Sequence, residues 1–283
     1  LADSSCPDSF FPNQHAKEEM SGKRKLVVVF GANGYVGRAI AKEFVKRGTV
    51  DLTAISRSGV PPEEKSPSSP SWTEKVDWVA ADSTKPDTYA KYLRGVSCVV
   101  TSIGVLPFGI SEEECFNGNA QTNIIPAKTA QHLHVNRFVA VGASLGFAGA
   151  LPGVKPYVEG KIAVENFAKN EFVRVGNNNN SESSGNTPGR APLAVIVKPG
   201  GISGTKSLGA GKMNIPLWML MDPVTFIMKR LGKLGLENSP VRVERVAKAV
   251  VNAALSDDEA RFLNGGYVEI SNEELLTNPK YDF

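Results

Sequence analysis

The stretch KLVVVFGANGYVGRAIAKEF, residues 25–44, decides the fold of this chain. Its residues 26–30 are five consecutive apolar side chains, which is typical of a strand covered on both faces. A glycine turn follows, and from Val36 onward the apolar residues recur at helical spacing. Unpaired amide groups and the positive end of the helix dipole meet at such a helix N-terminus. The stretch therefore predicts a strand, a turn and a helix that together bind a phosphate.

The three glycines of this turn have separate expected roles. Gly31 permits the tight turn, Gly34 lets the backbone approach a pyrophosphate, and Gly37 lets the helix pack close to the sheet. A glycine string alone is a weak signal, because glycine turns after strands are common. The strand before it and the helix after it favour dinucleotide binding. The cofactor contacts expected in this stretch are Gly31, Asn33, Gly34, Tyr35, Val36 and Gly37.

The composition is that of an ordinary globular chain and excludes several kinds of function. The 283 residues are 41% hydrophobic and 22% charged, and the net charge of +3 is too small to indicate nucleic-acid binding. The three cysteines lack metal-type spacing, and His132 and His134 lack a carboxylate-rich partner motif, so we expect reduced thiols and no metal site. No run of 18 apolar residues occurs, so no membrane-spanning helix is expected.

Two segments are expected to lie outside the packed fold. Residues 1–24 are polar and carry several acids, and the chain begins at Leu1 rather than Met. We expect a flexible N-terminal extension, left either by removal of an organellar presequence or by truncation. Residues 177–190, NNNNSESSGNTPGR, are of low complexity and are expected to form a disordered insertion.

Strands and helices alternate along residues 25–202, which are expected to form the dinucleotide-binding domain. This alternation predicts an α/β fold with a doubly wound parallel sheet. From residue 203 the pattern changes, and residues 203–283 are expected to form a small C-terminal lid region that builds the substrate pocket on the same domain. The expected further strands are 50–55, 76–80, 96–102, 137–142, 193–197 and 262–270, and the expected helices are 86–94, 112–134, 157–169 and 241–255.

The end of the second predicted strand indicates which nicotinamide cofactor is bound. An acid at this place would bind a ribose 2′-hydroxyl, whereas a basic residue with a hydroxyl suits a 2′-phosphate. Ser56 and Arg57 therefore favour NADP(H) over NAD(H), and Arg38 could add a second cation. The alternative is that both arginines are solvated surface residues. Later strand ends supply the remaining candidate cofactor contacts, which are Asp82, Ser83, Ile103, Gly104, Pro199 and Gly200.

A second group of residues suggests acid–base chemistry. Tyr157 and Lys161 are four apart on a predicted helix, so their side chains share one face. A neighbouring ammonium lowers the pKa of a phenol toward the neutral range, so Tyr157 could protonate a substrate oxygen while Lys161 also holds the cofactor ribose. Ser144 could polarise a substrate carbonyl, and Asn117 could anchor a water that relays protons to the lysine. Tyr-x-x-x-Lys also arises by chance, as an exposed tyrosine and a solvated lysine.

The motifs GANGYVG, SRSG, YVEGK and VKPGGISG, with Ser144 and the Ala-Asp-Ser turn at 81–83, resemble the atypical or extended short-chain dehydrogenase/reductase family over residues 25–270. The segments IPLWMLMDPV and SPVRVERVAKAVVNAAL are more closely similar to plant plastoglobule Rossmann proteins and the mitochondrial coenzyme Q biosynthesis reductase-like protein. The NADPH-binding accessory subunit of respiratory complex I is a more distant relative. Two departures from the family are Lys198, where arginine is common, and the 177–190 insertion.

This resemblance implies a Rossmann fold, NADP(H) binding and a place in prenylquinone or lipid metabolism. The leading hypothesis is an NADP(H)-dependent oxidoreductase acting on a carbonyl or quinone-like lipophilic substrate. The alternatives are a non-catalytic NADPH-binding subunit or assembly factor of an organellar membrane complex, and an isomerase or epimerase. The expected location is organellar, with a chloroplast plastoglobule or thylakoid favoured over a mitochondrion.

The apolar stretch at 214–231 allows two interpretations. It is either the core of the lid region, or a seat for a prenyl tail that lies on a membrane. In the second case residues 214–233 make peripheral contact with a membrane, a lipid droplet or an organellar membrane complex. Asp222-Pro223 interrupts the stretch, which argues against one continuous interfacial helix. The sequence does not predict an oligomeric state.

Overall fold

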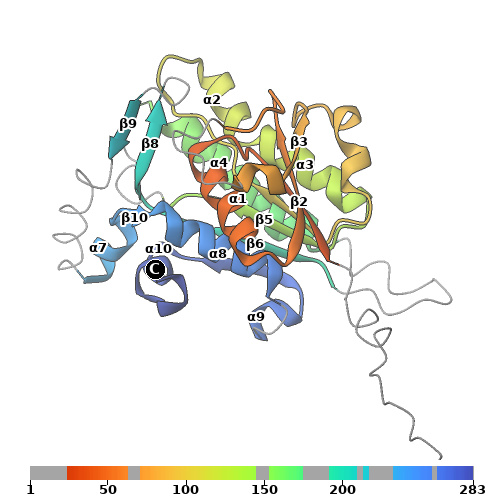
Figure 1. Cartoon of the computed structure of the whole chain (residues 1–283). Coiled ribbons are helices and arrows are strands. Elements are labelled where there is room, and N and C mark those ends of the chain that lie inside the picture. The colour runs from red at the N-terminus through yellow and green to blue at the C-terminus, as the bar shows by residue number, and fades with distance from the viewer. Residues whose placement is uncertain are drawn as a thin grey trace, which may run out of the picture.

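A computed structural model describes residues 24–62, 71–144, 153–174, 191–208, 213–216, 232–256 and 260–282. Its centre is a seven-stranded sheet with the strand order β11-β6-β5-β4-β1-β2-β3 (Figure 1). Every pairing in this sheet is parallel. The strand order reverses between β1 and β4, and ligands of such sheets bind outside the carboxyl ends of the strands at this switch point. The predicted doubly wound α/β fold is confirmed.

The central strands are rich in β-branched residues because helices cover both faces of the sheet. All five residues of β5 and of β6 are buried, and so are the last four residues of β1. The predicted strands lie close to their expected positions, except for the last. The strands of the sheet are β1 (Lys25–Phe30), β2 (Val50–Ser56), β3 (Asp77–Ala80), β4 (Cys98–Thr101), β5 (Arg137–Val141), β6 (Leu193–Val197) and β11 (Gly266–Ile270).

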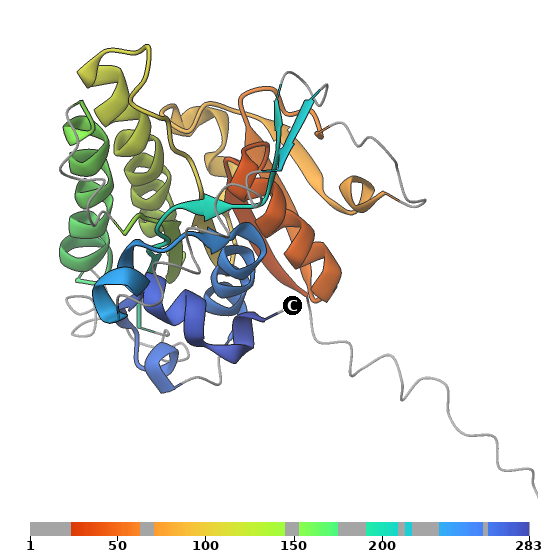
Figure 2. The ribbon, with the colours of Figure 1, turned by 90° about the vertical axis from the view of Figure 1, so that its left-hand side faces the viewer.

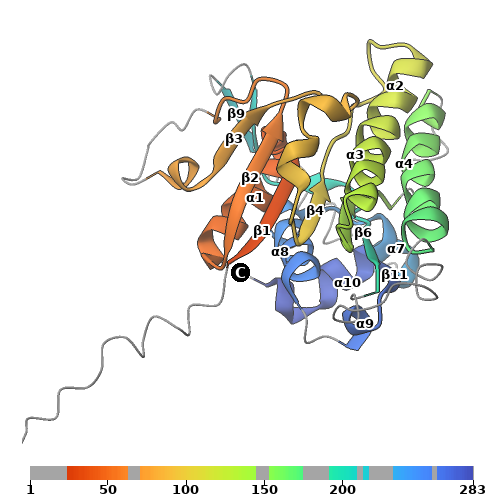
Figure 3. The ribbon, with the colours of Figure 1, turned by 90° about the vertical axis from the view of Figure 1, so that its right-hand side faces the viewer.

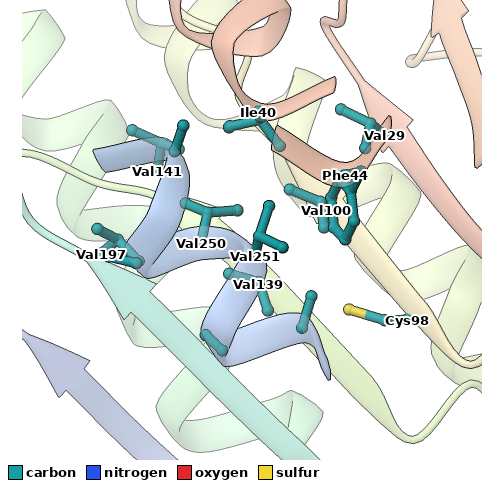
Figure 4. Packing of buried hydrophobic residues seen from close by; sticks show 14 of the residues in the cluster. Val29, Ile40, Phe44, Cys98, Val100, Val139, Val141, Val197, Val250 and Val251 are labelled. Carbon is teal, nitrogen blue, oxygen red and sulfur yellow. The ribbon is translucent and has the colours of Figure 1, made fainter. Parts of the chain in front are cut away.

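Two helical layers enclose the sheet. Val27 and Val29 of β1 point into one hydrophobic core, under α1 (Tyr35–Arg47) and α8 (Val243–Leu255), and Figure 4 shows part of it. Val28 and Phe30 point into a second core on the opposite face. Figure 3 shows the helices that cover this face, which are α2 (Glu112–Asn119), α3 (Gln121–His132) and α4 (Lys155–Phe167).

Two predicted helices on this second face differ from the sequence expectation. The helix expected at 86–94 is instead two short 3₁₀ turns, η3 (Pro86–Thr88) and η4 (Ala90–Leu93). Tyr89 lies between them, and its fully buried ring is 4.9 Å from that of Phe30, so side-chain packing overrides helical periodicity here. The helix expected at 112–134 breaks into α2 and α3 at Ala120, where φ is −97° and ψ is −74°.

The C-terminal segment is not a layer of its own. Its β11 extends the main sheet beyond β6, and α8 packs against α1 on the same face. The strand expected at 262–270 is shorter, because residues 260–263 form the helix α9 (Ala260–Leu263). Part of the expected C-terminal region thus joins the main sheet, since a parallel sheet can take its last strand from a distant part of the chain.

Smaller elements lie at the carboxyl edge of the sheet and beside it. Figure 2 shows the antiparallel hairpin of β8 (Thr205–Leu208) and β9 (Met213–Pro216) projecting above this edge. A short parallel pair joins β7 (Ile202–Ser203) to β10 (Val241–Arg242). The remaining described elements are η2 (Trp72–Lys75), the π-helix η6 (Ala168–Phe172), α7 (Gly232–Asn238), α10 (Asn272–Thr277) and η9 (Pro279–Tyr281).

Several expectations fall partly or wholly outside the described part of the chain. These are the N-terminal extension up to residue 23, the insertion at 177–190, and residues 217–231 of the apolar stretch. Among the described residues no helix is both long enough and apolar enough to cross a membrane. Within the same residues, no three His, Cys, Asp or Glu side chains gather as metal ligands would. Cys98 and Cys115 are buried free thiols.

Candidate functional site

The glycine turn joins β1 to α1 at the switch point of the sheet. Gly31 adopts φ +81°, and its amide donates to the carbonyl of Ile55 at 3.0 Å. Gly34 is the N-cap of α1, and no side chain caps that helix end. The first turn of α1 also carries no acid, so its open amides keep the partial positive charge of a helix N-terminus. This arrangement suits a phosphate group.

The turn is packed so closely that larger residues would not fit. A Cβ on Gly37 would lie 2.1 Å from the carbonyl oxygen of Gly31. A Cβ on Gly31 would lie 2.9 Å from Cγ1 of Ile103, which follows β4. The turn therefore forms a cradle of bare backbone over the carboxyl ends of β1 and β4, and this cradle fits the pyrophosphate of a dinucleotide.

Asn33 connects the glycine turn to the end of β2. Its Nδ2 lies 3.1 Å from Ser56 Oγ, 3.1 Å from Ser58 Oγ and 2.7 Å from the carbonyl oxygen of Val60. Ser56 Oγ also accepts a hydrogen bond from the amide of Gly59. The side chains of Asn33 and Ser56 thus hold this loop in place. Sequence reasoning missed Ser58, since nothing in the motif indicates which residue the asparagine reaches.

Two arginines lie beside this loop. Arg57 is exposed at the end of β2, and Arg38 Nε donates to the carbonyl oxygen of Asn33 at 3.0 Å. Burial lowers the pKa of Arg38. Asp82 and Ser83 follow the adjacent β3, and Asp82 Oδ1 accepts hydrogen bonds from the amide and hydroxyl of Thr84, which lower the pKa of the carboxyl. The predicted ribose and adenine contacts therefore lie along one edge of the sheet.

Tyr35 and Val36 face away from the open side of the glycine turn. Val36 packs against the core beneath α1 and α8. The hydroxyl of Tyr35 is buried against Gly204, where an added Cβ would come within 2.3 Å of it. Burial, followed by the nearby Glu244, raises the pKa of this phenol. Both side chains therefore take part in packing, and the cofactor contacts predicted for these two residues stay a prediction.

Tyr157 and Lys161 lie on α4, over the ends of β4 and β5. Lys161 is only 5% exposed, and its Nζ donates to the carbonyl oxygens of Ile103 and Val141, both at 3.2 Å. The same Nζ lies 6.0 Å from the centroid of the Tyr157 ring. Burial lowers the pKa of Lys161 to about 8, and the charge of Glu165 opposes this. The alternative of a solvated lysine is wrong.

The pKa of Tyr157 differs from the expectation. Burial, with a smaller effect of Cys115, raises this pKa, whereas the sequence predicted that Lys161 would lower it. The reason is that the ammonium is directed at two carbonyl oxygens rather than at the phenol. No described residue exchanges a hydrogen bond with the hydroxyl of Tyr157. The phenol is therefore held in its protonated form, which is the form that can donate a proton.

Asn119 is the asparagine of α2 whose side chain binds the loop after β4. It is fully buried, and its amide group bonds the backbone of Val105 in both directions, at 3.2 and 2.9 Å. A Cβ on Gly104 would lie 3.1 Å from Asn119 Oδ1 and 3.3 Å from Lys161 Nζ. Asn117 is half-buried and forms no hydrogen bond with a described residue. The role predicted for Asn117 in a proton relay to Lys161 stays a prediction.

Ser144 follows β5 and bonds the backbone of two other segments. Its Oγ donates to the carbonyl oxygen of Glu237 in α7 at 2.9 Å, and its amide bonds the carbonyl of Pro199. It lines a pocket of about 440 Å³ in which Tyr157 and Lys161 are not among the described lining residues. Ser144 therefore connects the end of β5 to α7 and to the loop after β6, and its role at a substrate carbonyl stays a prediction.

The last cofactor candidates are held by the C-terminal segment. The amide of Gly200 donates to Asn272 Oδ1 at 2.7 Å, and a Cβ on Gly200 would meet the carbonyl oxygen of Ser239 at 2.8 Å. Asn272 Nδ2 also bonds the carbonyls of Leu236 and Ser239. Asn272 therefore fixes the loop after β6. Sequence reasoning missed this residue, because a single asparagine after the last strand belongs to no recognisable motif.

The fold and the glycine turn define a dinucleotide-binding α/β protein. A family model described as NAD(P)H-binding matches residues 31–172, about half of the chain. The chain therefore belongs to this NAD(P)H-binding family. That match spans the glycine turn, the end of β2 and the Tyr157–Lys161 pair.

Three proteins of known name are similar to this chain. An uncharacterized chloroplastic protein of Arabidopsis thaliana is 28% identical over 83% of this chain and 73% of its own length. MIOREX complex component 2 of Saccharomyces cerevisiae is 39% identical over 28% of each chain. Among solved structures, an oxidoreductase of the short-chain dehydrogenase/reductase family from Burkholderia thailandensis superposes with a TM-score of 0.58 at 18% identity, covering 90% of this chain and 94% of that one. At this identity the superposition shows the shared fold.

Proposed function

We propose that the chain is an NADP(H)-dependent oxidoreductase of the short-chain dehydrogenase/reductase type that reduces a carbonyl or quinone-like lipophilic substrate. The observation that carries this proposal is the buried Lys161, held between the carbonyls of Ile103 and Val141 next to the ring of Tyr157. Burying an ammonium group costs free energy of folding. Ionisable groups with strongly perturbed pKa values are common at functional sites, so such a lysine is a candidate for a functional role.

The residues divide the chemistry between them. A bound NADP(H) supplies the hydride of the reaction. Tyr157, which burial keeps protonated, donates its proton to the substrate oxygen. Lys161, whose Nζ lies 6.0 Å from the centroid of the Tyr157 ring, then favours the phenolate that remains, since a nearby positive charge stabilises the charged form of a phenol. The cradle of Gly31, Gly34 and Gly37 binds the pyrophosphate.

The end of β2 supports a preference for NADP(H). No acid stands at Ser56 or Arg57, where a carboxylate would accept hydrogen bonds from the ribose 2′-hydroxyl of NAD(H). Arg57 is exposed there, and Arg38 lies behind the same loop. Two guanidinium groups beside a 2′-phosphate form charge-assisted hydrogen bonds that a 2′-hydroxyl does not offer.

The loop between β4 and α2 supports a lipophilic substrate. Its sequence VLPFGI, residues 105–110, follows Gly104 directly at the carboxyl edge of the sheet. Leu106 is 60% exposed and Phe108 is 76% exposed, which is unusual for large apolar side chains grouped in one loop. Asn119 fixes the base of this loop beside Lys161. An apolar group bound against the loop would thus extend from the Tyr157–Lys161 pair.

The proposed setting is an organelle, with the chloroplast favoured over the mitochondrion. It draws on the chloroplastic Arabidopsis relative and on the plastoglobule resemblance of the sequence. We propose peripheral contact with a membrane or lipid droplet through residues 214–233, although most of this stretch lies outside the described residues. The Saccharomyces relative is a complex component, so attachment to an organellar complex is a second candidate for the same contact.

Titration of the full chain with NADPH and NADH, followed by nicotinamide fluorescence, tests the cofactor half of the proposal. We expect NADPH to bind more tightly, and tighter NADH binding would contradict the assignment to Arg57. Loss of nicotinamide absorbance in the presence of a short-tailed ubiquinone or plastoquinone analogue, or of a long-chain aldehyde, tests the substrate half. Cofactor binding without turnover of any such compound would favour the non-catalytic NADPH-binding subunit.

A further inference from the structure

A line of charged side chains connects Lys161 to the surface of the molecule. Lys161 and Glu165 are four residues apart on α4 and so share one face of the helix. Glu165 Oε2 lies 3.2 Å from Lys198 Nζ, and the same Nζ lies 3.4 Å from Glu269 Oε1. The side chains of Glu165, Lys198 and Glu269 are 17%, 22% and 42% exposed. The charges therefore alternate in sign from the interior outward.

The two oxygens of Glu165 have different surroundings. While Oε2 binds Lys198, Oε1 is buried and has no hydrogen-bond partner among the described residues. This Oε1 lies 3.6 Å from the position that a Cβ on Gly142 would take. The preceding residue, Val141, accepts the hydrogen bond from Lys161 Nζ. The carboxylate of Glu165 and the ammonium of Lys161 thus both lie at the end of β5.

We propose that Glu165 is a positioning residue that keeps Lys161 in its charged form beside Tyr157; this inference rests on the oxidoreductase function proposed above. The attraction of Glu165 opposes burial, which lowers the pKa of Lys161 to about 8. Without this attraction Lys161 would lose its proton near neutral pH, and a neutral amine cannot stabilise the phenolate of Tyr157. The ionisable groups that face Glu165 are Lys161 on its own helix, Lys198 after β6, and Tyr267 and Glu269 on β11.

Lys198 explains why Glu165 remains a carboxylate in this environment. Burial raises the pKa of Glu165, whereas the charge and hydrogen bond of Lys198 act in the opposite direction. Burial of Lys198 lowers its own pKa, but the two carboxylates more than compensate and raise it. The pKa of Glu165 stays raised overall, but the charge of Lys198 offsets part of the effect of burial and so favours a negative charge one helical turn from Lys161.

The protonation of Lys161 can be measured directly and without a substrate. The full chain is labelled with ¹⁵N-lysine, the side-chain resonance of Lys161 is assigned with Lys161→Arg, and this resonance is followed as a function of pH. In Glu165→Gln we expect the pKa of Lys161 to fall by about one pH unit, because the opposite charge is lost. Glu165→Asp keeps the charge and should restore most of the difference.

Glu159→Gln is the matched control, since Glu159 lies on the exposed side of the same helix and pairs with Lys155 at 3.7 Å. It should leave the titration of Lys161 unchanged. If Glu165→Gln does not fold, the double variant Glu165→Gln/Lys198→Met removes the buried pair as a unit and should lower the pKa of Lys161 in the same direction. An unchanged pKa in the folded variants would overturn the inference.

The outcome separates this inference from the proposed function. A wild-type chain that shows the coupling but oxidises no NADPH refutes the oxidoreductase function alone. Turnover by the wild type, together with an unchanged Lys161 in Glu165→Gln, refutes the role of Glu165 alone. If both hold, the basic limb of the pH–rate profile, where Lys161 loses its proton, should be unchanged in Glu159→Gln and displaced to lower pH in Glu165→Gln.

Discussion

The glycine turn and the Tyr157–Lys161 pair lie over the same edge of the sheet, but the first is formed by backbone atoms and the second by side chains. The turn consists of backbone, and its selectivity comes from the absence of side chains at Gly31 and Gly37. The pair consists of side chains, and its chemistry comes from an ammonium buried against two carbonyls. The first region should therefore fail when atoms are added, whereas the second should fail when a functional group is removed.

The largest effect should come from the chemical half of the site. Tyr157→Phe removes only the hydroxyl that donates the proton, so turnover should fall by about a hundred- to ten-thousand-fold while NADPH affinity stays within a few-fold. Steady-state kinetics and a fluorescence titration of the same sample measure both quantities. Equal turnover by the two proteins would show that Tyr157 only packs beside Lys161.

Within the glycine turn, the substitution with the largest expected effect on stability and NADPH binding is at Gly37. Gly37→Ala places a Cβ 2.1 Å from the carbonyl oxygen of Gly31, which forces the turn apart. We expect a loss of about 2–3 kcal/mol in the free energy of unfolding, together with loss of NADPH binding. Urea unfolding and a fluorescence titration test this. Gly201→Ala is the control, because its nearest atom would lie at 3.7 Å, an ordinary contact.

Lys161 should make stability depend on pH in a defined direction. Its pKa is about 8 in the folded chain and close to the ordinary 10.5 when unfolded, so the unfolded chain binds more protons between these values. The wild type should therefore gain stability, relative to Lys161→Met, as the pH rises from 7 to about 10. The gain should be on the order of 2 kcal/mol in the free energy of unfolding.

Urea unfolding of both proteins at several pH values measures this difference. Lys155→Met, on the exposed side of α4, should show no comparable change relative to the wild type. The contrary outcome is a difference in the free energy of unfolding between Lys161→Met and the wild type that is the same at every pH. Lys161 would then be solvated in solution, which would contradict its burial in this structure.

The smallest effect should lie at the outer edge of the cofactor site. Arg57→Ala removes one charge-assisted contact to the 2′-phosphate, so NADPH affinity should fall about tenfold while NADH affinity stays the same. Isothermal titration with both cofactors measures the change, and Arg57→Lys should retain part of the preference. A parallel loss for both cofactors would instead indicate that Arg57 supports the Asn33 loop.

The sequence predicted the cofactor half better than the substrate half. The cradle of Gly31, Gly34 and Gly37 depends on residues adjacent in the chain, so its geometry follows from a local pattern. The prediction of one continuous helix at 112–134 was wrong. The break at Ala120 depends on how α2 packs against α4, where Gly160 allows close approach to Asn119. That packing also places Asn119 next to Gly104, where an added Cβ would lie 3.1 Å from Asn119 Oδ1 and 3.3 Å from Lys161 Nζ.

The sequence by itself determined the class of fold, the position of the dinucleotide turn and the pairing of Tyr157 with Lys161. Each of these depends on periodicity or on neighbours within a few residues. Only the tertiary structure decided that Lys161 is buried, that Ser144 bonds α7, and that Glu165 reaches Lys198 across the end of β6. Such contacts join segments far apart in the chain, and their charges depend on burial, which no local pattern specifies.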